Sequence, residues 1–218
     1  MSQRPYVIVN VAQSLNGFIS GKDGRKVIIS SPEDMVRVHE LRSEVEAILI
    51  GSGTVIADDP RLIVDQNVVQ KEKFPLRVVL DRSLRTRIGS RVYDSSAKTV
   101  IYTAKAREDD RKCEIRTRDE KGLKLQNILS ELHDEGIRKM LVEGGRSIIT
   151  SFIEERYIDE FYIYIGDIII EEGGLELFSP GFEIRNVIKS AESFGKGVLI
   201  SLDPYHLQRL WKTQVKDS

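Results

Sequence analysis

The sequence contains a single cysteine, Cys113, and only three histidines among its 218 residues. One cysteine cannot form an internal disulfide, which favours a reducing compartment. His39, His133 and His206 lie far apart in the sequence and have no cysteine or histidine partner at the spacing of zinc ligands. We therefore expect each histidine to be a helix-surface or capping residue, and we predict no metal site.

The chain also lacks an excess of charge of one sign and a long hydrophobic run. Its formal net charge is −1, and its basic residues are interleaved with acids, whereas a nucleic-acid-binding protein shows a basic excess. The most apolar late stretch, FYIYIGDIII, is interrupted by Gly166 and Asp167 and is too short to cross a bilayer. The N-terminus has no signal-peptide pattern. We predict a soluble cytoplasmic protein that binds neither nucleic acid nor a membrane.

Strand and helix patterns alternate along the chain. We predict buried strands at 6–12, 47–50, 77–80, 99–102, 139–142 and 161–165, and helices at 32–44, 123–136 and 147–157. Ser31 is the expected N-cap of the first helix, with Pro32 at its first position. Late strands are expected at 199–202 and 207–211, with Asp203-Pro204 as a break between them. This order predicts one α/β domain over residues 1–218, with a mostly parallel central sheet, helices on both faces and antiparallel C-terminal strands.

Two blocks share a layout of apolar strand, glycine turn and helix start. The first is AILIGSGTVIADDP at residues 47–60, and the second is KMLVEGGRSIIT at residues 139–150. Glycines let backbone N–H groups approach an anion at a helix N-terminus, where the helix dipole favours a phosphate. Two such turns suggest a shared nucleotide ligand. A Gly-Gly turn also commonly just ends a strand without binding a ligand, and the chain lacks the G-x-G-x-x-G fingerprint of a Rossmann fold.

Several polar side chains flank these turns. Thr54 and Asp58 are four residues apart, which on a helix places both on one face. They could instead be an N-cap and part of a turn. Arg42 precedes the strand that leads to Gly51 and could bind a phosphate, although a solvated helix arginine is the commoner case. The 81–85 segment, DRSLR, could hold the extra phosphate that distinguishes NADP from NAD, or could be a plain basic loop.

Taken in order, the blocks NVAQSLNG, SSPED, LRSEVEAILIGSGTVIADDPRL, PLRVVLDRSLR, LVEGGRSI and YIDEFYIYI resemble those of a known family. The family is the riboflavin-pathway reductases with a dihydrofolate-reductase-like fold. The resemblance is strongest to the stand-alone archaeal and fungal 2,5-diamino-6-ribosylamino-4(3H)-pyrimidinone 5′-phosphate reductases. It covers nearly the whole chain, and no partner zinc deaminase accompanies it. The resemblance implies hydride transfer from NADPH to C1′ of a ring-opened ribosylamine, and a homodimer.

The resemblance also implies roles for individual residues. Arg42, Leu62 and Glu143 match substrate-binding positions, and Glu143 is the best candidate for a catalytic role at the reacting end. Positions that match NADPH contacts lie in three segments: Thr54 and Asp58; Arg82, Ser83, Leu84 and Arg85; and Gly144, Gly145, Arg146, Ser147 and Ile148. Arg82 and Arg85 favour NADPH over NADH if they face the adenosine ribose.

Several positions depart from the family pattern. Asn16 replaces the usual aspartate of an S-L-D-G turn, which removes a carboxylate proton donor. Asp65 stands where a basic residue often helps to hold the substrate phosphate, and a carboxylate there would repel it. Arg146 replaces a small residue, and Gly166-Asp167 replaces Ala-Pro. The departures at Asn16 and Asp65 leave open a reductase of the same fold that acts on another pterin-like or pyrimidine substrate. A separate alternative is a nucleotide-binding module that kept the glycine turns and has no catalytic activity.

Overall fold

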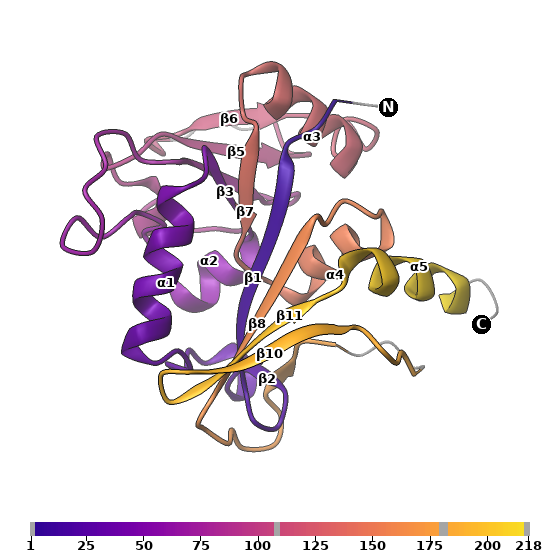
Figure 1. Ribbon diagram of the computed structural model, residues 1–218. Helices are drawn as coiled ribbons and strands as arrows, with labels where there is room; N and C mark the ends of the chain where they lie inside the picture. Colours follow the sequence, from indigo (N-terminus) through magenta and orange to yellow (C-terminus); the bar gives the residue numbers. More distant parts are fainter. Residues whose placement is uncertain (1–2, 107–109, 179–182, 216–218) are drawn as a thin grey trace. The chain divides into compact units, whose positions relative to one another are not determined.

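The computed structural model describes residues 3–106, 110–178 and 183–215. The chain forms two compact units that are interleaved in sequence (Figure 1). Unit 1 comprises Met1–Tyr6 and Val38–Gly145, and unit 2 comprises Val7–Arg37 and Arg146–Ser218. Both units combine strands with helices, which confirms the predicted α/β class.

Unit 1 is built on parallel strands in the order β7-β3-β4-β5-β6. The strands are β3 (Ala47–Gly51), β4 (Leu76–Leu80), β5 (Thr99–Thr103), β6 (Glu114–Thr117) and β7 (Lys139–Val142). The helices are α2 (Ser52–Asp58), α3 (Leu125–Asp134) and the 3-10 turn η2 (Arg91–Tyr93). Every residue of β3 and of β5 is buried, as expected for parallel strands covered on both faces.

Unit 2 contains a mixed sheet in the order β10-β11-β8-β1. Its strands are β1 (Tyr6–Ser14), β8 (Glu160–Gly166), β10 (Ile188–Phe194) and β11 (Gly197–Leu202), and β2 (Phe18–Ser20) pairs separately with β9 (Leu175–Glu176). The helices that begin in this unit are η1 (Lys22–Gly24), α1 (Pro32–Ser43), α4 (Arg146–Glu154) and α5 (Pro204–Val215). β8 runs parallel to β1, whereas the β10–β11 hairpin, orange to yellow in Figure 1, is antiparallel and joins β8 through β11. The predicted antiparallel late strands are confirmed.

The predicted strand at 207–211 is wrong, because these residues lie in α5. Asp203 accepts a hydrogen bond from the backbone N–H of His206 at 3.0 Å, and Pro204 opens the helix. Leu207 and Trp211, four residues apart, are 3% and 4% exposed and share the buried face of the helix. An aspartate cap followed by proline at the first helical position is therefore a helix start here rather than a break.

The other predicted elements are present, with ends shifted by a few residues. The start of α1 follows the sequence expectation, because the Ser31 hydroxyl accepts a hydrogen bond from the Asp34 N–H at 3.3 Å. Over the described ranges, no helix is long and apolar enough to cross a membrane.

Candidate functional site

The two glycine turns meet in unit 1, at the ends of neighbouring parallel strands. β3 pairs directly with β7, and the Glu143 N–H donates to the carbonyl of Leu49 at 3.1 Å. The next residue, Gly144, lies against Thr54: a Cβ at Gly144 would be 3.5 Å from the Thr54 hydroxyl oxygen. The carboxyl ends of parallel strands are where α/β proteins hold ligands. The turns are thus placed as one shared ligand site requires.

Thr54 lies inside α2, which excludes the alternative that it is an N-cap. The helix begins at Ser52 after Gly51 in the N-cap position, and it ends at Asp58, before the C-cap residue Asp59 in a left-handed conformation (φ 42°). Thr54 and Asp58 are therefore one turn apart on the same face of a helix, as the spacing predicted.

The second turn has a backbone that only glycine adopts readily. Gly144 has φ 114° and Gly145 has φ 80°. The chain then enters α4, the first helix of unit 2 after the turn, whose first three residues are Arg146, Ser147 and Ile148. Ser147 is exposed, and the other two are half-buried. A positive-φ glycine pair ahead of a helix presents N–H groups without side chains in front of them, which suits a phosphate-bearing cofactor.

The 82–85 loop is shaped by a buried carboxylate. Asp81 is fully buried and accepts hydrogen bonds from the N–H groups of Arg85 (2.9 Å) and Thr86 (2.8 Å). This arrangement accompanies the left-handed backbone of Leu84 (φ 52°), whose side chain is buried. Arg82 and Ser83, the two residues before Leu84, are exposed.

The two arginines of this loop have different partners. Arg85 donates from Nη2 to the hydroxyl of Ser52 at 3.0 Å, which brings its charge to the start of α2. Arg82 pairs with Glu120 at 2.6 Å, and both side chains are about two-thirds exposed at 67% and 65%. Of the two, Arg85 lies at the end of β3, beside the first glycine turn.

Arg42 and Glu143 form a bidentate ion pair. Nε and Nη2 of Arg42 each donate to one carboxylate oxygen of Glu143 at 2.6 Å, and Nη1 donates to the carbonyl of Ile63 at 3.2 Å. Burial alone would lower the pKa of Arg42, but the Glu143 carboxylate outweighs burial and raises it. These bonds use three of the five guanidinium N–H groups, so two remain for a ligand.

Leu62 and Asp65 lie in the segment that follows α2. Leu62 is 3% exposed and has a left-handed backbone conformation, with φ 50°. The Asp65 carboxylate accepts hydrogen bonds from the backbone and side-chain amides of Asn67 at 2.9 and 3.1 Å. The carboxylate is therefore held within its own turn.

His39 was not predicted as part of this region. Its Nδ1 accepts a hydrogen bond from the backbone N–H of Asp65 at 3.1 Å, and its side chain is half-buried. The available signal was its position one helical turn before Arg42, which places both residues on one face. Among the residues that the structure describes, no cluster of His, Cys, Asp or Glu could hold a metal ion.

Two departures from the family pattern have local structural reasons in unit 2. Asn16 donates from Nδ2 to the carbonyl of Ile170 at 2.7 Å and accepts from the Ile170 N–H at 3.1 Å. An aspartate could make only the second bond when ionised. At Gly166 a Cβ would lie 2.3 Å from the carbonyl oxygen of Ile29, so only glycine fits.

Known proteins share both the sequence pattern and this architecture. The pattern of the RibD C-terminal domain matches residues 5–200. A protein of Archaeoglobus fulgidus, named 2,5-diamino-6-ribosylamino-4(3H)-pyrimidinone 5′-phosphate reductase, is 39% identical over 217 residues, which cover 91% of this chain and 97% of that protein. The protein of the same name from Debaryomyces hansenii is 30% identical over 207 residues, which cover 83% of this chain and 82% of that protein.

A crystal structure supports the same assignment. The Thermotoga maritima diaminohydroxyphosphoribosylaminopyrimidine deaminase/5-amino-6-(5-phosphoribosylamino)uracil reductase matches with a TM-score of 0.76 and 26% identity, over 92% of this chain and 57% of that one. This similarity confirms the predicted dihydrofolate-reductase-like fold. Because the pattern extends through nearly all of both units, the chain belongs to the RibD C-terminal domain family.

Proposed function

We propose that the chain reduces the ribosyl group of 2,5-diamino-6-ribosylamino-4(3H)-pyrimidinone 5′-phosphate to the ribitylamino group with NADPH, as a step of riboflavin biosynthesis. Two relatives carry this reductase name, and each alignment covers at least four-fifths of this chain and of the relative. The structural observation that carries the proposal is the Arg42–Glu143 pair, because it places a carboxylate and two spare N–H donors directly before Gly144.

The substrate is assigned to residues that offer complementary hydrogen bonds. Glu143, paired with a guanidinium, is an acceptor and suits the amino or hydroxyl groups of a ribosylaminopyrimidine. Arg42 offers its remaining donors to a phosphate or carbonyl oxygen, and Leu62 supplies apolar contact. In this role Glu143 anchors the substrate and does not donate the proton.

The cofactor is assigned to the surroundings of the two glycine turns. Gly144 and Gly145 fit a pyrophosphate, because they carry no Cβ that would stand in front of their N–H groups. We assign the remaining contacts to Thr54, Asp58 and the 82–85 loop, with Arg85 near the adenosine ribose. When bound, NADPH supplies the hydride that C1′ of the ring-opened ribosylamine accepts, and the adjacent nitrogen takes a proton from solvent. The chain itself orients the substrate and excludes water.

The assembly of the chain is a further part of the proposal. We propose that the two units act as one reductase domain and that the chain forms a homodimer. Analytical ultracentrifugation at micromolar concentration tests the dimer, which predicts a single species of twice the chain mass of 24.8 kDa. A species at the chain mass would contradict it.

One assay tests the proposed reaction. The purified protein is incubated with NADPH and the diamino-ribosylamino-pyrimidinone phosphate, and the loss of NADPH absorbance is followed while the product is identified by mass. We expect NADPH oxidation and a product with two additional hydrogens. Oxidation only with another pyrimidine or pterin would indicate a different substrate, and binding of NADPH without oxidation would indicate a nucleotide-binding module.

A further inference from the structure

The segment from Arg61 to Asp65 is held by three side chains of the surrounding elements. The Arg61 carbonyl accepts a hydrogen bond from Nη1 of Arg77 at 3.1 Å, and the Ile63 carbonyl accepts one from Nη1 of Arg42 at 3.2 Å. The Asp65 N–H donates to Nδ1 of His39 at 3.1 Å. The anchored groups belong to alternate residues, and the two side chains between them, Leu62 and Val64, are 3% and 0% exposed.

Arg77, on β4, is completely buried, which is costly for a charged side chain. Its guanidinium is nevertheless fully hydrogen-bonded: Nε donates to Thr99 at 2.8 Å, Nη1 to the Asp94 carboxylate at 2.9 Å, and Nη2 to the carbonyls of Asp94 and Ala97. An apolar residue at this position would fill the core without the free-energy cost of burying a charge, but it could not donate a hydrogen bond to the Arg61 carbonyl.

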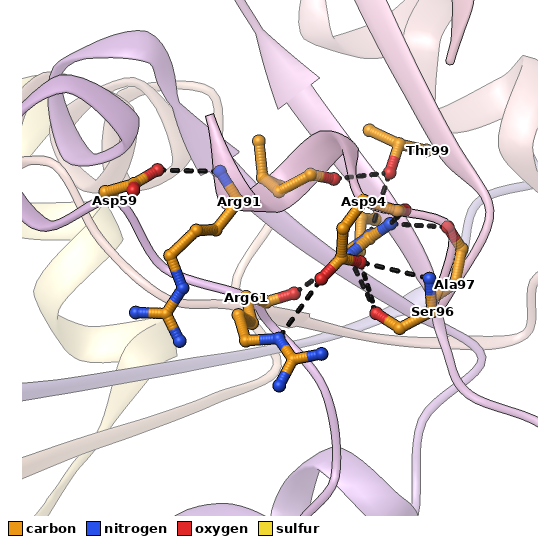
Figure 2. Close-up of polar contacts among 9 residues, drawn as sticks. Asp59, Arg61, Arg91, Asp94, Ser96, Ala97 and Thr99 are labelled. Atoms are coloured by element: carbon orange, nitrogen blue, oxygen red, sulfur yellow. Dashed lines mark hydrogen bonds and ion pairs between the residues drawn. The ribbon is translucent and has the colours of Figure 1, made fainter. Parts of the chain in front are cut away.

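Further contacts hold Arg61, the first residue of the segment, and Asp59, two positions before it (Figure 2). The Asp94 carboxylate forms a second ion pair, with Nε of Arg61 at 3.1 Å. The Asp59 carboxylate accepts a hydrogen bond from the N–H of Arg91 at 2.8 Å. The chain after α2 is thus fixed on the side of η2 and β4 by Arg77, Asp94 and Arg91.

His39 holds the other end of the segment as a neutral acceptor. Burial and the neighbouring Arg42 lower the pKa of His39, while the charges of Asp65 and Glu143 oppose that shift. An imidazole that accepts at Nδ1 carries its proton on Nε2. Protonation of Nδ1 would remove the acceptor and set two N–H donors against each other.

We propose that His39 and Arg77 are positioning residues that, together with Arg42, clamp the segment Arg61–Asp65 in the conformation that binds the substrate. The inference rests on the proposed function, because Leu62 and Arg42 are assigned there to the substrate. The clamp explains how Leu62 keeps a left-handed backbone conformation, which costs about 1 kcal/mol or more for a branched side chain.

The test compares His39→Leu, which removes the acceptor, with His39→Asn, whose Oδ1 can replace Nδ1. We expect His39→Leu to raise the KM for the pyrimidinone phosphate about tenfold, which corresponds to one lost hydrogen bond, with kcat and the Kd for NADPH within about twofold of wild type. His39→Asn should restore the KM. His133→Gln, a half-buried histidine of α3, is the matched control and should leave all three constants unchanged.

The pH dependence separates a positioning role from a merely structural one. The substrate phosphate itself titrates near pH 6, so the wild-type profile is compared with that of His39→Asn, which shares this titration. We expect the KM of wild type, relative to His39→Asn, to rise as the pH falls through the lowered pKa of His39. Parallel profiles would overturn the proposed role of His39.

Amide hydrogen exchange tests the clamp without turnover. In the free protein, exchange of the 61–65 segment should be at least about tenfold faster in His39→Leu and in Arg77→Lys than in wild type. Unchanged exchange together with an unchanged KM would overturn the clamp. Failure of the wild-type protein to turn over the substrate would instead overturn the proposed function, because the exchange experiment needs no activity. If Arg77→Lys does not fold, the His39 series decides alone.

Discussion

Arg42 and Glu143 lie 101 positions apart in the sequence and are joined by two parallel hydrogen bonds of 2.6 Å. Their side chains are only 14% and 11% exposed, so water cannot replace either partner well. Loss of one partner from such a pair costs far more than loss from an exposed pair, because a buried charge is left uncompensated. The pair therefore fixes the position of the carboxylate at the end of β7.

Glu143→Gln should impair the substrate site and leave the cofactor site intact. The amide offers one acceptor instead of two and carries no charge, so we expect kcat/KM for the pyrimidinone phosphate to fall about 10- to 100-fold, as for a lost charge-assisted hydrogen bond. The Kd for NADPH should change less than about twofold. Steady-state kinetics and a fluorescence titration with NADPH measure both quantities.

The control for this variant is Glu44→Gln, which breaks an exposed ion pair with Lys139. Exposed pairs contribute little, so its kinetics and stability should match those of wild type. Wild-type kinetics in Glu143→Gln itself would remove Glu143 from the site.

Gly144→Ala should damage both stability and cofactor binding. At φ 114° an alanine is strained, and its Cβ would lie 3.5 Å from the Thr54 hydroxyl. We expect the free energy of unfolding to fall by about 2 kcal/mol and the Kd for NADPH to rise more than about tenfold. The variant is measured by denaturant titration and NADPH binding.

Gly53→Ala is the matched control, because Gly53 lies within α2 and a Cβ there meets no atom within 4 Å. It should raise the free energy of unfolding by about 0.5–1 kcal/mol. Equal effects of the two substitutions would show that the conformation of Gly144 does not matter.

The apolar strands of the sheet could be predicted from the sequence, because a strand that is buried on both faces requires an apolar run such as AILI or RVVL. β6 and β10 could not. The buried residue of β6 is Arg116, whose charge is compensated by Glu114, Glu131 and Glu135, so the strand is hidden in a charged run. β10 is an edge strand whose residues are almost all exposed, so it has no apolar face to detect.

The site was predictable to the extent that local spacing determines it. Thr54 and Asp58 share a face because they are four residues apart on a helix. The Arg42–Glu143 pair instead depends on the adjacency of β3 and β7, which are separated in sequence by β4, β5 and β6. No local pattern shows which strands of a parallel sheet are neighbours. His39 was missed for another reason: its partner is a backbone N–H, so only its spacing from Arg42, and no residue type, indicates its role.

Asp94 should control the acid stability of unit 1. Burial would raise the pKa of its carboxyl, but hydrogen bonds from Ser96, Arg77 and Arg61 outweigh burial and hold the pKa well below the ordinary 3.8. Because the folded pKa is lowered, the stabilisation is complete above the unfolded pKa and is lost as the pH falls below about 3.8 towards the folded value.

Asp94→Asn should therefore flatten the acid-unfolding curve in this range. At neutral pH it should lower the free energy of unfolding by about 3 kcal/mol, because Arg77 stays buried without its counter-charge. Circular dichroism at stepped pH measures the curve. Asp134→Asn, whose carboxylate is 72% exposed, is the control and should preserve the wild-type profile. A wild-type slope in Asp94→Asn would mean that another group carries the acid transition.

Arg85→Gln should reduce the preference for NADPH over NADH. Arg85 lies at the end of β3 through its bond to Ser52, and a guanidinium there can bind the 2′-phosphate that only NADPH carries. Loss of a charge-assisted hydrogen bond costs about 1.5–3 kcal/mol, so we expect the Kd for NADPH to rise at least about tenfold and that for NADH to change less than about twofold.

Arg82→Gln should have a smaller effect, because Arg82 is exposed and paired with Glu120. Arg87→Gln, an exposed arginine outside the loop, is the control for total charge. If all three variants weaken NADPH equally, the preference arises from the overall field and not from Arg85.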